Sequence, residues 1–421
     1  MSKLIITPSY LWRKFILAKK LTQLLGKSEG NLDVGSMEFL SWLWGGKKLG
    51  DRLGCDCTSA HGRLGKSEWA APRIVSYSTE ASRKDQGNTI ESTEYQDDDD
   101  VLLAKVDMIV SLIKQASFCT VYTGAGLSRT AGIEDYASKD TSIHSNIKPL
   151  GSPFNAQPTM AHRVLAALQK HGYLHHYVQQ NHDGLPQKAG FPQEKMNEIH
   201  GAWYDPSNPV VQFSGKLRSD MFNWMKVVEK KTDLCLCLGT SLSGMNADRI
   251  AETPAYRSLE EEDIIGTVII NLQRTRLDDK SALRVWGSLD HIFELIAQKL
   301  ELDMVPVVID PPLSFNDQFP IPYNAAGLYD PNCTMIWDLR DNAAVVVTNP
   351  DACNFGQEGA IFAKDDQQNY IVHINYREHR LGKWWIQTIM NGKCPSHLPF
   401  VNISPIVRCS RVVEADERTE L

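Results

Sequence analysis

Short apolar stretches that alternate with helical patterns dominate residues 101–303 of this 421-residue chain. Phe118–Tyr122, Leu234–Leu238 and Ile264–Leu272 are β-prone, and 173–178 resembles a fourth strand. Apolar residues recur at intervals of three and four in the segments 101–116, 158–170, 221–228 and 292–300, which predicts helices there. Strands alternating with helices are typical of a parallel sheet covered on both faces. The sequence therefore predicts an α/β fold, a Rossmann-like doubly wound parallel sheet.

Polar clusters follow three of the predicted strands: Gly124–Ser128, Gln180–Asp183 and Gly239–Leu242. Ligands of open parallel sheets bind at the carboxyl ends of the strands, so these clusters are candidate site residues. Gly124-Ala125-Gly126 can turn sharply and bring backbone N–H groups close to a dinucleotide pyrophosphate. Its spacing is not the usual G-x-G-x-x-G fingerprint, so a tight turn without a ligand is the alternative.

Five segments occur in an order that resembles the sirtuin family of NAD-dependent protein deacylases. They are TGAGLSRTAGIED at 123–135, QNHDGLPQKAG at 180–190, the pair His200-Gly201, GTSL at 239–242 and INLQRT at 270–275. The resemblance covers about residues 101–303. It implies NAD as cofactor, an acyl-lysine protein substrate, and transfer of the acyl group to ADP-ribose with release of nicotinamide.

The resemblance also implies roles for individual residues. His200 would be the general base on the ribose, which suits an imidazole with an ordinary pKa of about 6.5. Asn181 would position the reacting centre, and Asp183 would accept a hydrogen bond from the nicotinamide carboxamide. Asn-x-Asp-Gly is also a good turn sequence, and this is the structural alternative for both residues. The other cofactor-binding residues would be Gly124, Ala125, Gly126, Ser128, Asp135, Gln180, Gly239, Thr240, Ser241 and Asn271.

Three single positions depart from the family pattern. Ala137 replaces an arginine that helps to hold NAD, with Arg129 or Lys139 as candidate substitutes. Pro186 replaces a histidine, and His182 stands where an apolar residue usually lines the nicotinamide pocket.

The largest departure is the absence of the family's zinc ribbon. Between Gly201 and Thr232 there is no cysteine or histidine, whereas a tetrahedral zinc site needs four such ligands. We therefore expect a reduced small domain and no metal there. Cys394 and His397 with Cys333 or Cys353 form a less favoured metal set. The edge Val210–Phe213, to which the family adds its peptide substrate, is followed by an extra Ser214, and this puts peptide docking in doubt.

The two ends carry weaker signals. Residues 1–28 hold six basic and no acidic side chains, which fits either a mitochondrial transit peptide or a basic tail within an N-terminal extension, 1–100. Residues 58–100, with Asp97–Asp100, are expected to be a solvated linker. Residues 304–421 are interpreted as a proline-rich linker and a small β-rich domain, with strands at 335–337, 345–348, 370–376 and 384–389. Trp384-Trp385 is either a partner patch or core.

Composition limits the partners and the compartment. The net charge of −7 argues against general nucleic-acid binding, and no apolar run is long enough for a membrane-spanning helix. An odd count of nine cysteines favours a reducing, intracellular compartment over a disulfide framework, with mitochondrion, cytoplasm and nucleus all open. Three functions remain open: a deacylase, an NAD hydrolase or ADP-ribosyl transferase on the same scaffold, and a catalytically weak subunit of a protein complex.

Overall fold

The computed structural model describes residues 60–78, 92–133, 152–212, 215–304, 315–390 and 397–409. All belong to one compact unit, Arg52–Leu421. The expected targeting segment 1–28 lies outside these ranges, as do Pro306, Pro311 and Pro312 of the expected linker, whereas Pro320 of that linker lies in a strand, Gln318–Ile321. None of the helices within them combines the length and the apolarity that a bilayer crossing requires.

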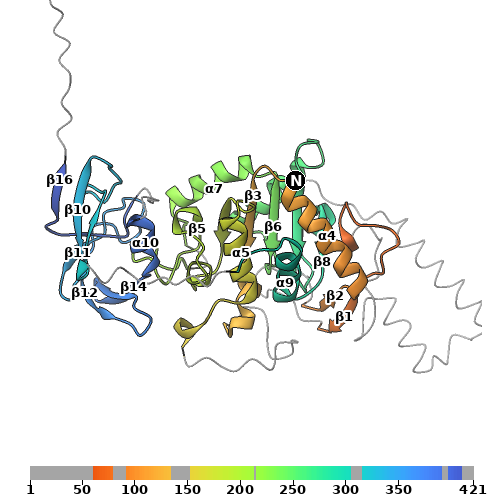
Figure 1. Ribbon diagram of the computed structural model, residues 1–421, viewed down its shortest axis with the longest axis horizontal. Helices are drawn as coiled ribbons and strands as arrows, with labels where there is room; N and C mark the ends of the chain where they lie inside the picture. Colours follow the sequence, from red (N-terminus) through yellow and green to blue (C-terminus); the bar gives the residue numbers. More distant parts are fainter. Residues whose placement is uncertain are drawn as a thin grey trace, which may run out of the picture. The chain divides into compact units, whose positions relative to one another are not determined.

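A six-stranded parallel sheet forms the centre of the larger domain (Figure 1). Its spatial order is third, second, first, fourth, fifth and sixth strand, which is the order of the dinucleotide-binding doubly wound fold. The strands in that order are β5 (Met196–Glu198), β4 (His176–Gln179), β3 (Cys119–Thr123), β6 (Leu234–Leu238), β7 (Gly266–Ile270) and β8 (Leu283–Val285). This confirms the predicted fold class.

Helices cover both faces of this sheet, as the apolar strands require (Figure 1). One apolar cluster joins the sheet to α4 (Asp99–Gln115), α5 (Met160–Lys170) and α9 (Leu289–Lys299). A second joins it to α7 (Ser219–Lys231) and α8 (Arg249–Arg257). Cys235 and Cys237 lie in this second core.

The described parts of the segment before α4, residues 60–78 and 92–98, are not a solvated linker, contrary to the expectation from its charge. Strands β1 (Arg73–Ser76) and β2 (Glu94–Gln96) pair, and Ile74 and Tyr95 pack with Trp286. Asp97 is fully buried and accepts two hydrogen bonds of 2.7 Å from Lys105 Nζ. A buried charge needs such a partner, and a sequence pattern alone does not reveal one eight residues away.

Residues 315–409 form the predicted β-rich domain from two antiparallel sheets. The first contains β16 (Ile406–Cys409), β10 (Cys333–Asp338) and β9 (Gln318–Ile321). The second contains β14 (Arg377–Leu381), β13 (Tyr370–Ile374), β12 (Glu358–Lys364), β11 (Ala344–Val346) and β15 (Val401–Asn402).

One predicted strand of this domain is wrong: residues Trp384–Met390 form helix α10. Its apolar residues are buried on almost every side, so neither a period of two nor one of 3.6 was visible in seven residues. Trp384 and Trp385 belong to the core and are not an exposed patch.

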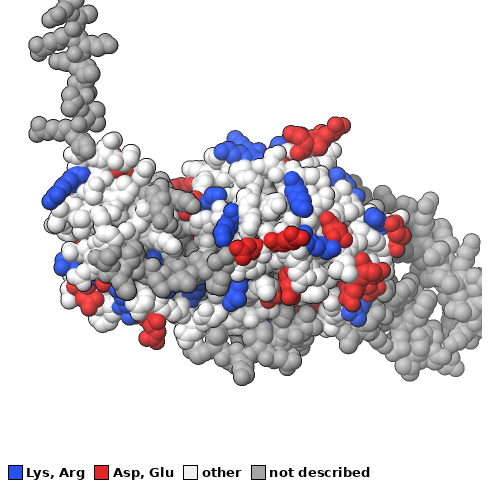
Figure 2. Space-filling model, viewed as in Figure 1, with Lys and Arg blue, Asp and Glu red and all other residues white. Residues whose placement is uncertain are grey.

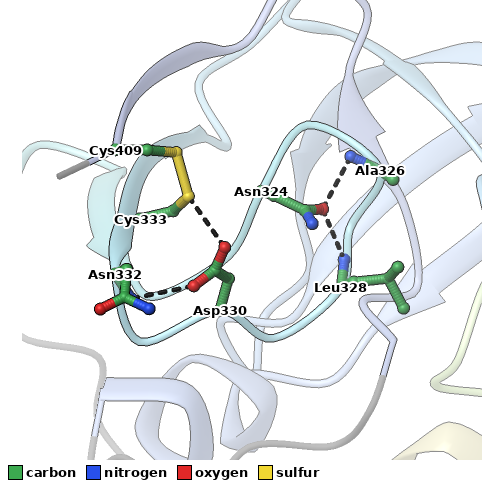
Figure 3. Close-up of a disulfide and its surroundings, with 7 residues drawn as sticks. All are labelled: Asn324, Ala326, Leu328, Asp330, Asn332, Cys333 and Cys409. Carbon is green, nitrogen blue, oxygen red and sulfur yellow. Dashed lines mark hydrogen bonds between the residues drawn. A yellow bond between two sulfur atoms is a disulfide. The ribbon is translucent and has the colours of Figure 1, made fainter. Parts of the chain in front are cut away.

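A disulfide joins Cys333 to Cys409, although the cysteine count argued against a disulfide framework. The two residues face each other directly in the β10–β16 pair. Two turns flank the bond, one with Asn324 accepting from Ala326 and Leu328 N–H, the other with Asp330 accepting from Asn332 N–H (Figure 3). Cys333 is therefore not available as a metal ligand, and the described residues contain no cluster of metal-binding side chains. Cys394 lies outside them.

Lysines and arginines are interspersed with acidic side chains over the described surface shown in Figure 2. The expectation about nucleic acid stays a prediction.

We predict that reduction of Cys333–Cys409 destabilises the β-rich domain. The bond closes a loop of 76 residues and restricts the unfolded chain, which corresponds to about 2–4 kcal/mol. Thermal unfolding should therefore occur at lower temperature in dithiothreitol. Cys409→Ser should unfold at the lower temperature with or without reductant, and Cys353→Ser, at a free exposed cysteine, should behave as the parent. Equal midpoints for the oxidised and reduced parent would contradict this.

Candidate functional site

The predicted site lies where the strand order reverses, between β3 and β6. Here the turns after the two strands are in direct contact: Gly126 N–H donates to Gly239 O at 2.9 Å. A Cβ on Gly126 would lie 2.8 Å from Gly239 Cα, and Gly239 has a positive φ of 57°. The glycines are thus needed for the close approach of two turns. The N–H groups of Gly124 and Gly126 are already bound to Leu238 and Gly239 carbonyls and are not free for a phosphate.

A chain of polar side chains, with Asn181 half-buried and Ser128 and Asp183 buried, connects the turn after β4 with the turn after β3. Asn181 Nδ2 donates to Gly124 O at 3.0 Å and to Ser128 Oγ at 3.1 Å. Ser128 Oγ donates to Asp183 Oδ2 at 2.6 Å, and Leu185 N–H donates to Asp183 Oδ1 at 2.9 Å. Both oxygens of the buried Asp183 carboxylate therefore have one donor each and keep further acceptor capacity.

Hydrogen bonds also hold the other predicted residues at this edge. Gln180 Nε2 donates to Thr240 Oγ1 at 2.9 Å, and Asn271 Nδ2 donates to Thr240 O at 3.4 Å. Ser241 Oγ is hydrogen-bonded to Ser243 Oγ. The structure thus brings the predicted residues after β3, β4, β6 and β7 to one edge of the sheet. Asp135 lies outside the described residues, as do Glu134, Ala137 and Lys139.

His182 joins this edge to the turn that carries His200. Its Nδ1 lies 2.9 Å from Gly201 O, and its own carbonyl accepts from Trp203 N–H at 2.9 Å. Burial lowers the pKa of His182, so the ring favours the neutral form. The polar ring that departs from the family pattern thus fixes the segment 181–183 beside His200–Gly201.

The chain after Gly201 passes directly alongside His200. Val211 N–H donates to His200 O at 2.9 Å, and a Cβ on Gly201 would lie 2.5 Å from Pro209 O. Val210, in the predicted peptide-binding edge, is exposed. Phe213 and Ser214 lie outside the described residues, so the effect of the inserted residue stays a prediction.

The β-rich domain packs against the short turn 202–208, which stands where the sirtuin family has its zinc ribbon. Tyr204 is buried in the core of that domain. Its carbonyl accepts from Gly382 N–H at 3.1 Å and from Trp385 Nε1 at 3.2 Å, while Asn354 Nδ2 donates to Pro206 O at 2.8 Å. The domain therefore supports the turn that leads out of His200–Gly201.

Sequence reasoning missed a buried carboxyl close to His200. Glu198 ends β5 and accepts from Gln179 Nε2 and Gln193 Nε2, each at 3.1 Å. Gln193 Oε1 in turn accepts from Gln187 Nε2 at 3.1 Å and from Trp384 Nε1 of the β-rich domain at 3.0 Å. Burial, with a smaller contribution from Asp205, raises the pKa of Glu198 to about 7. The only sequence signal for this carboxyl is its position two residues before His200, because its hydrogen-bond partners come from distant segments.

Comparisons with known proteins find similarity to the family that the sequence motifs resemble. The family model described as Sir2 family matches residues 150–207, which include Asn181, Asp183 and His200. The NAD-dependent protein deacetylase SRT1 of Arabidopsis thaliana is 28% identical over 51% of this chain and 53% of its own length. The NAD-dependent protein deacetylase sirtuin-7 of Bos taurus is 27% identical over 53% of this chain and 66% of its own length.

A solved structure of Sir2Tm bound to a propionylated peptide is 22% identical and covers 47% of this chain and all of that one, with a TM-score of 0.40. The matched part spans about half the length of the first of these relatives. Over about half of its length the chain is similar to members of the Sir2, or sirtuin, family.

We predict that Glu198 makes stability depend on pH. Its pKa of about 7 in the folded state lies above the ordinary 4.5, so the folded state retains a proton that the unfolded chain releases. The contribution of this proton to the free energy of unfolding is complete below pH 4.5, declines between pH 4.5 and 7, and is absent above pH 7. The free energy of unfolding therefore falls by about 3 kcal/mol at most over this range. Glu198→Gln should lack that decline when urea midpoints are compared from pH 4.5 to 8.

Glu262→Gln, at an exposed acid between α8 and β7, is the matched control and should show the same pH dependence as the parent. Parallel pH curves for Glu198→Gln and the parent would show that this carboxyl does not titrate as described.

Proposed function

We propose that the chain is a sirtuin-type protein lysine deacylase that uses NAD. The observation that carries the proposal is the Asn181–Ser128–Asp183 hydrogen-bond chain, fixed beside His200 through His182 and Gly201. Names of relatives support NAD as the cofactor, and their similarity supports deacylase chemistry at the level of the family.

The described residues fit a dinucleotide at the switch point of the sheet. The contact between Gly126 and Gly239 leaves room for no side chain. Gln180 and Asn271 both hydrogen-bond to Thr240, so their polar side chains lie beside this contact. We assign Asp183 to the nicotinamide carboxamide, because its carboxylate is buried and retains acceptor capacity. Asp135, Ser128 and Ser241 stay in the proposed cofactor-binding set.

When bound, NAD supplies an electrophilic ribose carbon and nicotinamide as leaving group. The chain's own residues supply orientation and proton transfer. We assign His200 as the general base that removes a ribose hydroxyl proton, and Asn181 as the amide that orients the reacting centre. Asn181 is held from two sides, by Gly124 O and Ser128 Oγ, so little ordering is left for the reaction itself.

We further propose that an acyl-lysine peptide docks on the exposed edge at Val210. This edge is adjacent to His200 through the Val211 N–H bond, which would place a lysine side chain near the imidazole. Acylated peptide is also what the Sir2Tm structure contains.

One observation favours weaker binding of NAD. Arg129, a candidate substitute for the missing arginine at 137, lies 3.7 Å from Glu94 of β2 and is engaged there. An NAD hydrolase or ADP-ribosyl transferase, or a catalytically weak subunit that contributes to a protein complex, is therefore the second candidate. We also propose domain boundaries at residues 100 and 304. An intracellular compartment is a further proposal, and it is mitochondrial if residues 1–28 act as a transit peptide.

Nicotinamide release separates these functions. The purified chain should release nicotinamide from NAD only when an acetyl-lysine peptide is present. His200→Ala should slow release by about 100-fold or more, as expected for loss of a general base. His291→Ala, at an exposed histidine on α9, is the control and should match the parent.

Release that does not require peptide would favour the hydrolase or transferase. No release above the His200→Ala level, across acetyl and longer acyl groups, would overturn the deacylase and leave the non-catalytic role.

A further inference from the structure

A cavity of about 240 Å³ lies where α6 (Leu185–Lys188) and the loop before α5 meet the β-rich domain. Its lining includes Gln157, Lys188, Gln367, Asn369, Lys383 and the ring of Trp384. Ligand sites occur preferentially at domain interfaces, and pockets for drug-sized molecules are about 300–1,000 Å³. This cavity is smaller and suits a metabolite-sized molecule.

Two lysines from different domains give the cavity its charge. Lys188 Nζ donates to Phe154 O at 2.9 Å and Ala156 O at 3.3 Å, which fixes the ammonium at the wall. Burial, with a smaller contribution from the charge of Lys383, lowers the pKa of Lys188 to about 8 against the opposing effects of Asp183 and Asp365. An anion placed between the two lysines would relieve both the desolvation and the repulsion.

The Asp365 carboxylate beside the cavity already has hydrogen-bond donors of its own and lies 3.7 Å from Arg380 Nε. Asp365 accepts from Asn369 Nδ2 with both carboxylate oxygens, and from the N–H groups of Gln367 and Asn369. Gln367 Nε2 donates to Phe154 O at 2.8 Å, and Asn369 Oδ1 accepts from Lys383 N–H. These bonds fix the polar wall before any ligand arrives, which reduces the entropic cost of binding.

We propose that this cavity binds a small organic anion. Its carboxylate or phosphate group lies between Lys188 and Lys383, and its apolar part lies on the Trp384 ring. The site is separate from the switch point of the sheet, and the proposal does not depend on the proposed deacylase activity. Because the lysines come from the two domains, bound anion also strengthens the contact between them.

Calorimetric titration of the full chain tests the proposal, with inorganic phosphate, acetate and benzoate as probes at constant ionic strength. We expect saturable binding of at least one probe to a single site. Lys383→Gln should weaken that binding about tenfold or more, the effect of losing one charged hydrogen bond. Lys170→Gln, at an exposed lysine at the end of α5, is the matched control and should bind as the parent.

Comparison of the probes distinguishes the anion group: tighter phosphate binding indicates a phosphate ligand, and tighter benzoate than acetate binding indicates a carboxylate with a flat apolar body on Trp384. Lys188→Gln gives a second reading, with circular dichroism to confirm the fold, because Lys188 also holds two backbone carbonyls. No saturable heat from any probe, or equal binding by Lys383→Gln and the parent, would overturn the proposal.

Discussion

A buried carboxyl at the end of β5, an edge strand of the parallel sheet, needs hydrogen-bond donors from the protein itself, and the environment of Glu198 follows from this constraint. Its two oxygens accept from Gln179 at the end of β4 and from Gln193 after α6, which ties together the ends of β4 and β5, the strands that precede Asn181 and His200. Gln193 in turn depends on Trp384 for one of its partners. The geometry of the candidate site therefore extends into a domain that the family motifs do not include.

The same contact explains how the chain can lack a zinc ribbon. A metal-bound module in the family follows the His-Gly pair, whereas here seven residues turn back to Pro209. Such a short turn has too few apolar residues for a core of its own. Tyr204 enters the core of the β-rich domain, and backbone groups of the turn bond to it. Packing against a second domain thus provides the support that a metal would otherwise give.

The sequence was sufficient for the α/β half of the fold and for the order of its site segments, because both depend on short-range patterns: apolar periods and turns after strands. It was insufficient wherever one polar residue meets another from a distant segment. The acidic run predicts a solvated Asp97, yet this residue is buried and hydrogen-bonded to Lys105. The glutamines around Glu198 have no local signature, and α10 was too short and too apolar to show a period.

The interdomain cavity and the proposed cofactor site share structural elements. Lys188 lies at the end of α6, which begins two residues after Asp183, and the Trp384 that lines the cavity donates to the Gln193–Glu198 network. An occupant that fixes Lys188 and Trp384 would therefore bias the same segments that orient Asp183 and His200. Coupling between two sites is reciprocal, so NAD bound at the switch point would in turn change the affinity of the cavity. A β-rich domain that supports the site can by this route also regulate it.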